Sequence, residues 1–298
     1  MNVTFLSSKG YSDPHANNGD CILIDSGDEL IIFDCGCEEH AKRVLDYMKK
    51  HHYSKAKLIL SHNDSDHFNG IPYLLEQNAI SDIYTLLLLK YKTDLLNRIN
   101  DNRLSKQTIA ERIEEIFDNI YALSGQAILH DIFVETDVCT GVTIVGPDKD
   151  YALDAVAKRI DNRESDTIDK ETVVNAVSVQ VKIDFDNKKH LFLCGDSSYE
   201  AIKENLQKNT YSFVQLPHHG KLEQADMIFK QLGSFGITYY VSDNTGDSNG
   251  GSANLPSKGY AIKNTLAGDQ TCKGNSISPI GCYDQERNYA IFIGNFKV

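Results

Sequence analysis

The fold of this chain is decided by one short stretch, Ser61-His62-Asn63-Asp64-Ser65-Asp66-His67. The apolar run from Lys57 to Leu60 precedes it and predicts a buried strand. A helix is expected to follow from Gly70 to Glu76, where a proline near the start is tolerated. Two imidazoles and two carboxylates on a loop predict a bound cation, because unpaired carboxylates repel each other and lose solvation. A solvated loop without metal is the alternative.

A calcium-binding loop is a second alternative, and the spacing of the acidic residues rejects it. An EF-hand loop requires an oxygen ligand two residues after Asp66 and then a glycine, but Phe68 and Asn69 occupy these positions. The interspersed histidines also indicate a borderline transition metal rather than calcium.

The composition is that of an ordinary globular protein. The chain has 298 residues, of which 41% are hydrophobic and 24% are charged, and its formal net charge is −12. We expect residues 1–298 to form a single domain. The excess of acidic over basic residues argues against broad, non-specific binding of nucleic acids, because phosphate contacts require clustered Lys and Arg. The net charge does not argue against a small phosphate-bearing substrate in a local pocket.

The first residues and the cysteines indicate a cytoplasmic location. Residues 1–6 lack the basic start and apolar core of a signal peptide, and the sequence lacks a run of the ~20 apolar residues that a membrane span needs. The chain has 7 cysteines, from Cys21 to Cys282, and we expect reduced thiols. Cys35-Gly36-Cys37 is too tight for a redox pair and is interpreted as structural.

The N-terminal part predicts a layered α/β sandwich. Two apolar runs, 21–25 and 30–34, flank Ser26-Gly27-Asp28-Glu29 and predict a hairpin. A surface helix is expected from about Glu38 to Lys50. Asp34 lies at the end of the second strand, where it either caps that helix or orients a metal ligand.

The middle of the chain predicts a helical insertion at about 91–129. Residues 83–89 are expected to form a buried strand, and apolar residues at helical spacing predict helices at about 91–102 and 105–122. The insertion is either a cap over the site or a packed outer layer. Short strands are expected at 132–135 and 142–147, and a helix followed by a mobile loop is expected at 148–172.

Two further strands end in residues that bind metals. A strand at 177–185 and a turn at 186–189 lead to the return strand 190–194, which ends at Asp196 before a helix at 199–207. The strand 213–217 ends at His218-His219-Gly220. Asp196 alone is equally explained as a helix cap, and the two histidines as a turn. Three such strand ends together predict a metal centre.

These segments resemble the metallo-β-lactamase fold superfamily, and they are most similar to the metallo-β-lactamase domain of DNA-uptake competence proteins and its phosphorylcholine-esterase-like relatives. The resemblance implies a four-layer αββα sandwich with the helical insertion. It rests on six segments: Asn18-Gly19-Asp20, Phe33-Asp34-Cys35-Gly36, Ser61 to His67, Asn175-Ala176-Val177-Ser178, Leu193-Cys194-Gly195-Asp196 and Leu216-Pro217-His218-His219-Gly220.

The resemblance implies a binuclear metal site. His62 and Asp64 would hold the first metal, and Asp66 and His67 would hold the second. Asp196 would bridge both metals. The cofactors implied are two divalent ions, zinc or manganese, because an oxygen-rich first site also suits harder ions.

The chain departs from the common superfamily pattern at two positions. A histidine usually stands where this chain has Asp64, and a histidine ligand usually lies near the position of Asn175. His218 or its neighbour His219 would complete a metal shell. We assign the ligand role to His218 and leave the choice between the two open.

The implied activity is hydrolysis by a hydroxide that bridges the metals. Asp66 would orient this hydroxide while binding a metal. His219, or His218 if His218 is not a ligand, would stabilise the developing charge or protonate the leaving group. Asn175 would donate to a substrate oxygen.

The leading substrate is a phosphodiester, in a small molecule or at a nucleic-acid end, which makes the chain a phosphodiesterase or nuclease-like enzyme. The alternatives are a hydrolase of a lactone, thioester or β-lactam, and a non-catalytic binding module on the same fold. The loop 243–258 either selects substrate or is a plain connection. The helical insertion is a candidate surface for a homo-oligomer, and no membrane partner is expected.

Overall fold

The computed structural model describes residues 1–7, 19–99, 104–123, 127–161, 167–186, 188–243, 245–246 and 251–274. Within these residues, no helix is long and apolar enough to cross a membrane. Parts of several predicted features lie outside them, namely Asn18, residues 100–102 of the first insertion helix, residues 162–166, Asn187, Asn244, residues 247–250 and Cys282.

The first sheet has seven strands in the order β16-β1-β2-β3-β4-β5-β6. The predicted hairpin is confirmed, because β2 and β3 are antiparallel and Ile22 pairs with Phe33. From β3 to β6 the strands are parallel. The bounds are β1 Asn2–Phe5, β2 Ile22–Asp25, β3 Leu30–Phe33, β4 Ala56–Ile59, β5 Ile80–Thr85, β6 Ile128–Asp131 and β16 Gln270–Lys273.

The second sheet also has seven strands, in the order β15-β14-β13-β12-β11-β8-β7. Strands β11 and β12 form the predicted antiparallel pair, and β12 to β15 are parallel. A separate pair, β9 and β10, was not predicted from the sequence. The bounds are β7 Asp137–Cys139, β8 Val142–Gly146, β9 Thr167–Ile168, β10 Glu171–Thr172, β11 Gln180–Asp184, β12 His190–Leu193, β13 Phe213–Gln215, β14 Thr238–Val241 and β15 Ala261–Asn264.

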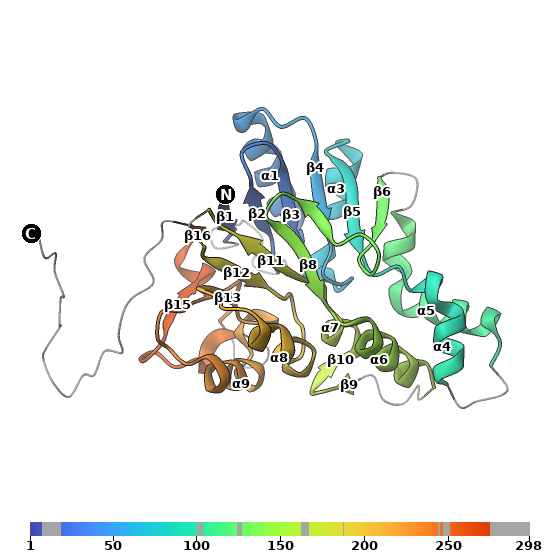
Figure 1. The fold of residues 1–298 in the computed structure, drawn as a ribbon. Coiled ribbons are helices and arrows are strands. Elements are labelled where there is room, and N and C mark those ends of the chain that lie inside the picture. The colour runs from blue at the N-terminus through green and yellow to red at the C-terminus, as the bar shows by residue number, and fades with distance from the viewer. Residues whose placement is uncertain are drawn as a thin grey trace, which may run out of the picture.

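Helices flank the two sheets (Figure 1). Helices α1 and α3 lie beside the first sheet, and α8 and α9 lie beside the second. The α-helices are α1 Glu38–His51, α2 Ser65–Phe68, α3 Ile71–Glu76, α4 Lys92–Arg98, α5 Lys106–Ala122, α6 Lys149–Asp161, α7 Val173–Ala176, α8 Tyr199–Lys208 and α9 Leu222–Leu232. Four 3-10 helices are η1 Leu88–Tyr91, η2 His218–Gly220, η3 Ser252–Asn254 and η4 Thr265–Ala267.

Apolar packing confirms the four-layer αββα sandwich. The main core contains buried side chains from both sheets, and Phe5 of β1 stacks on Tyr240 of β14 with ring centroids 4.7 Å apart. A second cluster fills the space between the second sheet and its helices, where Phe192 and Val214 pack with Ile202 and Phe229. The assignment of residues 1–298 to one domain stays our proposal.

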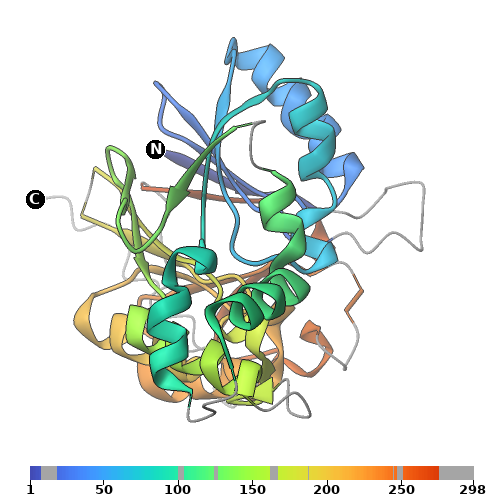
Figure 2. The same cartoon turned by 90° about the vertical axis from the view of Figure 1, so that its right-hand side faces the viewer.

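The helical insertion contains both predicted helices, as α4 and α5. Figure 2 shows them, in teal and green, on the side of the molecule that faces the viewer. The strand predicted at 83–89 lies too far along the chain, since β5 covers Ile80–Thr85 and η1 begins at Leu88. Likewise, β6 covers Ile128–Asp131, whereas a strand was expected at 132–135. After β5, Leu86 to Leu88 stay buried although they are no longer in the strand, so burial there extends further than strand pairing. After β6, Ile132 is buried but Val134 is 71% exposed, so the apolar run in that segment did not mark a strand.

The caps of two helices decide between alternatives that the sequence left open. The first residue before α1 is Cys37, whose thiol accepts a hydrogen bond from the His40 amide, so Asp34 is not the cap. Helix α8 is capped by Ser198, whose side chain accepts from the Ala201 amide, so Asp196 is not the cap there. Both aspartates are therefore available for other roles.

His40, which is fully buried in α1, should make stability depend on pH. Burial and, more weakly, the Arg43 guanidinium lower the pKa of His40 to about 3, against an opposing effect of Asp269. The unfolded chain then binds a proton below about pH 6.5 that the folded protein excludes, so stability falls as the pH drops. We expect the His40 contribution to cost about 2 kcal/mol at pH 5.

The measurement is chemical denaturation of the wild type and His40→Leu at pH 7.5 and pH 5. Subtracting the two proteins removes the contributions of other titrating groups. An equal loss of stability in both proteins on acidification would contradict this assignment.

Candidate metal centre

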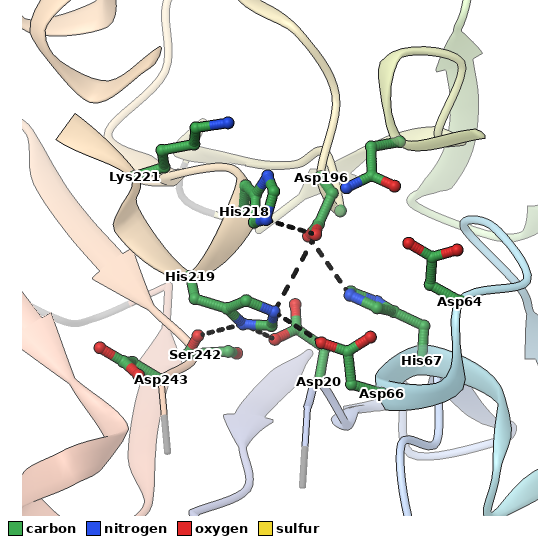
Figure 3. A network of polar contacts seen from close by, with 12 residues as sticks. Asp20, Asp64, Asp66, His67, Asp196, His218, His219, Lys221, Ser242 and Asp243 are labelled. Carbon is green, nitrogen blue, oxygen red and sulfur yellow. Dashed lines mark hydrogen bonds and ion pairs between the residues drawn. The ribbon is translucent and has the colours of Figure 1, made fainter. Parts of the chain in front are cut away.

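The three predicted strand ends meet at one place (Figure 3). Asp66 and His67 lie in the short helix α2 after β4, where the sequence predicted a loop, the residues after β12 supply Asp196, and η2 after β13 supplies His219. The His67 Nε2 atom lies 3.3 Å from Asp196 Oδ1, and His219 Nε2 lies 3.0 Å from Asp66 Oδ2. Side chains up to 153 positions apart in the sequence are thus in direct contact.

Two overlapping groups of side chains have the arrangement of metal ligands. Ligand atoms of His62, His67 and Asp196 lie within 4.8 Å of one another, as do those of Asp66, His67 and His219. His67 belongs to both groups. A third group of the same kind, formed by Asp20, Asp34 and His67, lies behind the His67 ring.

Buried polar atoms test whether these residues fit a metal. His62 Nε2, His67 Nε2 and Asp196 Oδ1 are all buried, and within the described residues none makes a hydrogen bond of proper geometry, although His67 Nε2 and Asp196 Oδ1 lie 3.3 Å apart. Buried polar atoms are nearly always satisfied, because leaving them unpaired costs free energy. A cation between the three atoms would satisfy all of them at once. The residues therefore fit a divalent metal.

Each imidazole of this centre is held by the nitrogen that points away from it. His67 Nδ1 lies 2.8 Å from Asp34 Oδ2, and His219 Nδ1 lies 2.9 Å from the Ser242 carbonyl oxygen. His62 Nδ1 lies 2.9 Å from the Ser61 hydroxyl. This pattern is typical of metal-binding histidines, since the outer contact fixes the ring and leaves Nε2 free for the metal.

The backbone at the centre is tightly packed and conformationally unusual. A Cβ atom on Gly36 would lie 2.1 Å from the Asp66 carbonyl oxygen, so only glycine permits this approach. Asp34, His218 and His219 all have positive φ angles, of 58°, 50° and 53°. Such angles are uncommon for residues other than glycine and often occur at functional sites.

The electrostatics of the centre favour bound positive charge. Burial, together with the neighbouring His67, lowers the pKa of His62 to about 3, so this ring is neutral at pH 7. Burial alone would raise the pKa of Asp196, but His67 and His219 outweigh it and hold the pKa well below its usual range. Burial alone would lower the pKa of His67, but the carboxylates of Asp196 and Asp34 outweigh burial and raise this pKa well above its usual value. The buried carboxylates thus require positive charge nearby, which a metal supplies.

Comparison with known proteins agrees with this arrangement. Residues 16–148, which include the loop after β4, match the family model of the metallo-beta-lactamase superfamily. The matched segment, slightly less than half of the chain, is similar to the metallo-β-lactamase superfamily. The resemblance to that superfamily is thereby confirmed, while its narrower branch of DNA-uptake competence proteins stays a prediction.

Individual relatives within and around this superfamily are distant. A ribonuclease Z of Methanosarcina acetivorans is 32% identical over 76 residues, which are 26% of this chain and 24% of that protein. A ribonuclease J of Mycoplasma genitalium is 25% identical over 203 residues, covering 62% of this chain and 34% of that protein. The matches therefore span only about a quarter to a third of these curated relatives. The crystal structure of a diphosphatase from the PhnP family has 11% identity and a TM-score of 0.49, and the match covers 94% of this chain and 100% of that one.

Within this metallo-β-lactamase fold, the two adjacent histidines after β13 occupy different positions. Both Nε2 atoms lie 3.9 Å from Asp196 Oδ2, but His219 Nε2 also lies 3.0 Å from Asp66 Oδ2 and belongs to a ligand group. His218 Nδ1 instead lies 2.6 Å from Glu171 Oε2. The geometry favours His219 as the metal ligand and His218 as the other histidine, the reverse of the assignment preferred from the sequence. These roles remain proposals.

Asp64 lies at the exposed edge of the centre, and Asn175 is connected to it through Ser178, whose hydroxyl donates to the Asn175 carbonyl oxygen at 2.7 Å and lies 3.2 Å from His62 Nδ1. The Asp64 side chain is 43% exposed, and its Oδ2 lies 3.7 Å from His62 Nε2. Asn175 in α7 is buried, and its Oδ1 accepts a hydrogen bond of 2.6 Å from the Thr172 hydroxyl. This contact orients the amide and leaves its nitrogen as the donor.

Glu171 is the residue of this region that the sequence analysis missed. It is buried in β10 and contacts His218, the Lys221 ammonium at 3.1 Å and the Gln224 amide at 2.8 Å. The stretch 148–172 predicted a helix followed by a mobile loop; the helix is confirmed as α6, but no local pattern indicated that one carboxylate of the following segment would be buried. Asp20 was quoted only as part of a motif, yet it lies 3.4 Å from His219 Nδ1.

Asp34 is expected to raise metal affinity without touching the metal. Its carboxylate accepts from the Ser61 amide at 2.7 Å and holds His67 at Nδ1. We expect Asp34→Asn to weaken zinc or manganese affinity by about 10–100-fold, the usual effect of removing such a partner. Competition with a chromogenic chelator measures this change. Asp25→Asn, a carboxylate held by Tyr47 and Tyr53 away from the centre, is the control. Equal affinity in both variants would refute the role of Asp34.

Proposed function

We propose that this protein is a metal-dependent hydrolase of phosphodiesters, acting on a small molecule or on the end of a nucleic-acid strand. The observation that carries the proposal is the pair of overlapping ligand groups that share His67 and contain the carboxylates of Asp66 and Asp196. Two-metal sites with carboxylate ligands suit phosphoryl transfer, since both the attacking and the departing oxygen need stabilisation. The relatives named as ribonucleases Z and J support the same class of substrate.

His62, Asp66, His67, Asp196 and His219 would hold two divalent ions, with Asp64 as a further ligand at the exposed edge. Zinc and manganese are both proposed, since the donors mix imidazole nitrogen and carboxylate oxygen. The ions, when bound, would lower the pKa of water and neutralise charge on the phosphoryl oxygens.

Three side chains of the protein would carry the remaining steps. Asp66 would orient the attacking water. His218, held at Nδ1 by Glu171, would donate a proton from Nε2 to the departing oxygen. Asn175 would donate from its amide nitrogen to an oxygen of the substrate.

The negative net charge limits the kinds of phosphodiester that the protein is expected to bind. A net charge of −12 disfavours long, non-specific contact with a polyanion. A small diester or a strand end therefore suits the protein better than a duplex. Hydrolysis of a lactone, thioester or β-lactam is the alternative reaction, and a non-catalytic module is the alternative class.

The test combines metal analysis with reporter substrates. Protein purified without chelators is expected to contain about two equivalents of metal by mass spectrometry. It should hydrolyse bis(p-nitrophenyl) phosphate faster than p-nitrophenyl acetate, a chromogenic lactone or a chromogenic cephalosporin. A faster reaction on a carbonyl substrate would favour the alternative reaction. Absence of metal, even after reconstitution, would favour the binding module.

A further inference from the structure

A basic pocket lies between helices α5 and α6, next to the loop that carries the proposed metal ligands. It has a volume of about 110 Å³, and its lining residues are Arg112, Glu115, Ile116, Arg159 and Ile160. A single water needs about 10–15 Å³ by the same kind of measure, so the pocket has room for a phosphate group. Two arginines and one glutamate give it a net charge of +1, in a chain whose net charge is −12.

The Arg112 guanidinium is already oriented in this pocket. Its Nη1 donates to the Ile160 carbonyl oxygen near the end of α6. Its Nε is buried and has no hydrogen-bond partner within the described part of the chain. The side of the guanidinium formed by Nε and Nη2 is therefore the side left for a ligand. This pair of parallel donors matches two oxygens of a phosphate.

A hydrogen bond connects the pocket to the metal-binding loop. Asn63 lies between His62 and Asp64, and its amide donates to the Ile116 carbonyl oxygen at 3.1 Å. Helix α5 is interrupted at the next residue, because Phe117 has non-helical angles of −126° and 31°. A side chain that bonds to a helix carbonyl is a known cause of such kinks. The wall of the pocket is thus tied to the loop of the proposed ligands.

We propose that this pocket binds a further phosphate group of the substrate, one that is not cleaved. The inference rests on the proposed phosphodiesterase function and defines its substrate as one that carries at least one additional phosphate. Arg112 would be the residue that recognises this phosphate. The link through Asn63 would place it on the same substrate as the scissile bond.

Matched p-nitrophenyl esters test the proposal. The series consists of p-nitrophenyl thymidine 5′-phosphate, the same ester with a 3′-phosphate, and esters of thymidylate oligomers with two and three nucleotides. We expect Arg112→Gln to raise KM about tenfold or more for at least one member with additional phosphates, since bonds to a charged group are strong. It should leave KM for the first ester unchanged. Arg112→Lys keeps the charge without the paired donors, so its KM should lie between those of the wild type and Arg112→Gln.

Arg98→Gln is the matched control, because Arg98 is also an arginine of the insertion but is paired with Asp150 and Asp154. It should change KM for no ester. A KM increase in Arg112→Gln that is equal for all esters, or absent for all, would overturn the proposal. Thermal melting checks that the Arg112 variants are folded.

A binding experiment separates this inference from the proposed function. Labelled trithymidylate is titrated into Asp66→Asn and into Asp66→Asn with Arg112→Gln. Binding that depends on Arg112, without hydrolysis of any ester by the wild type, would retain the pocket and reject the proposed function. Hydrolysis without dependence on Arg112 in either experiment would retain the function and reject the pocket.

Discussion

Asp196→Asn should lose both bound metal and hydrolytic activity. Asp196 is buried, its Oδ1 has no hydrogen-bond partner within the described residues, and it lies beside His67, His218 and His219. Replacing its carboxylate with a neutral amide removes the charge that would hold the metals together. We expect a fall in kcat/KM of at least about 10³-fold, which corresponds to about 4 kcal/mol of transition-state stabilisation.

The measurement is metal content by mass spectrometry together with the rate on bis(p-nitrophenyl) phosphate. Asp184→Asn is the control, since Asp184 is an aspartate of the same sheet that pairs with Lys182 and His190 outside the centre. Full activity in Asp196→Asn would refute the proposed centre. Loss of activity with full metal content would limit the role of Asp196 to a later step.

His218→Asn should reduce hydrolysis most strongly for substrates with poor leaving groups. The ring is held by the buried Glu171 on one side and lies 3.9 Å from Asp196 on the other, with 22% of its side chain exposed to solvent. Burial alone would lower the pKa of His218, but Glu171 and Asp196 raise it above its usual value. A donor in this position assists an alkoxide far more than an activated phenolate. We expect losses of about 10²–10⁴-fold for an alkyl leaving group.

The comparison uses p-nitrophenyl and methyl esters of the same thymidine phosphate. The loss for the p-nitrophenyl ester should be at least tenfold smaller, and the metal content should stay unchanged. Glu171→Gln should give the same selective loss in weaker form. His190→Asn, which alters a surface histidine paired with Asp184, should have no effect. If His218→Asn instead loses metal and slows both esters equally, then His218 is a ligand and the roles of His218 and His219 must be exchanged.

Local patterns were sufficient for much of the fold. The hairpin around Gly27, the alternating strand and the helices of the insertion depend on neighbouring residues, so their periodicity is visible in the sequence. The alternating strand was predicted at 177–185 and is shorter in the structure, Gln180–Asp184. The ends of strands were less visible, because burial continues past the last paired residue in the segment after β5. Strands β9 and β10 were missed, since each has only two residues.

For the candidate centre, too, some features were predictable from local sequence and others depended on tertiary contacts. The sequence by itself determined which residue types stand after β4, β12 and β13, and it predicted that candidate metal ligands would meet there. It could not distinguish His218 from His219, because the two are the same residue type and are adjacent in the chain. Only contacts with Glu171, 47 positions away, and with Asp66, 153 positions away, separate them. The tertiary structure alone also decided that Asp34 holds His67 and that Asn63 reaches the insertion, because these contacts depend on the packing of segments whose local sequences carry no information about each other.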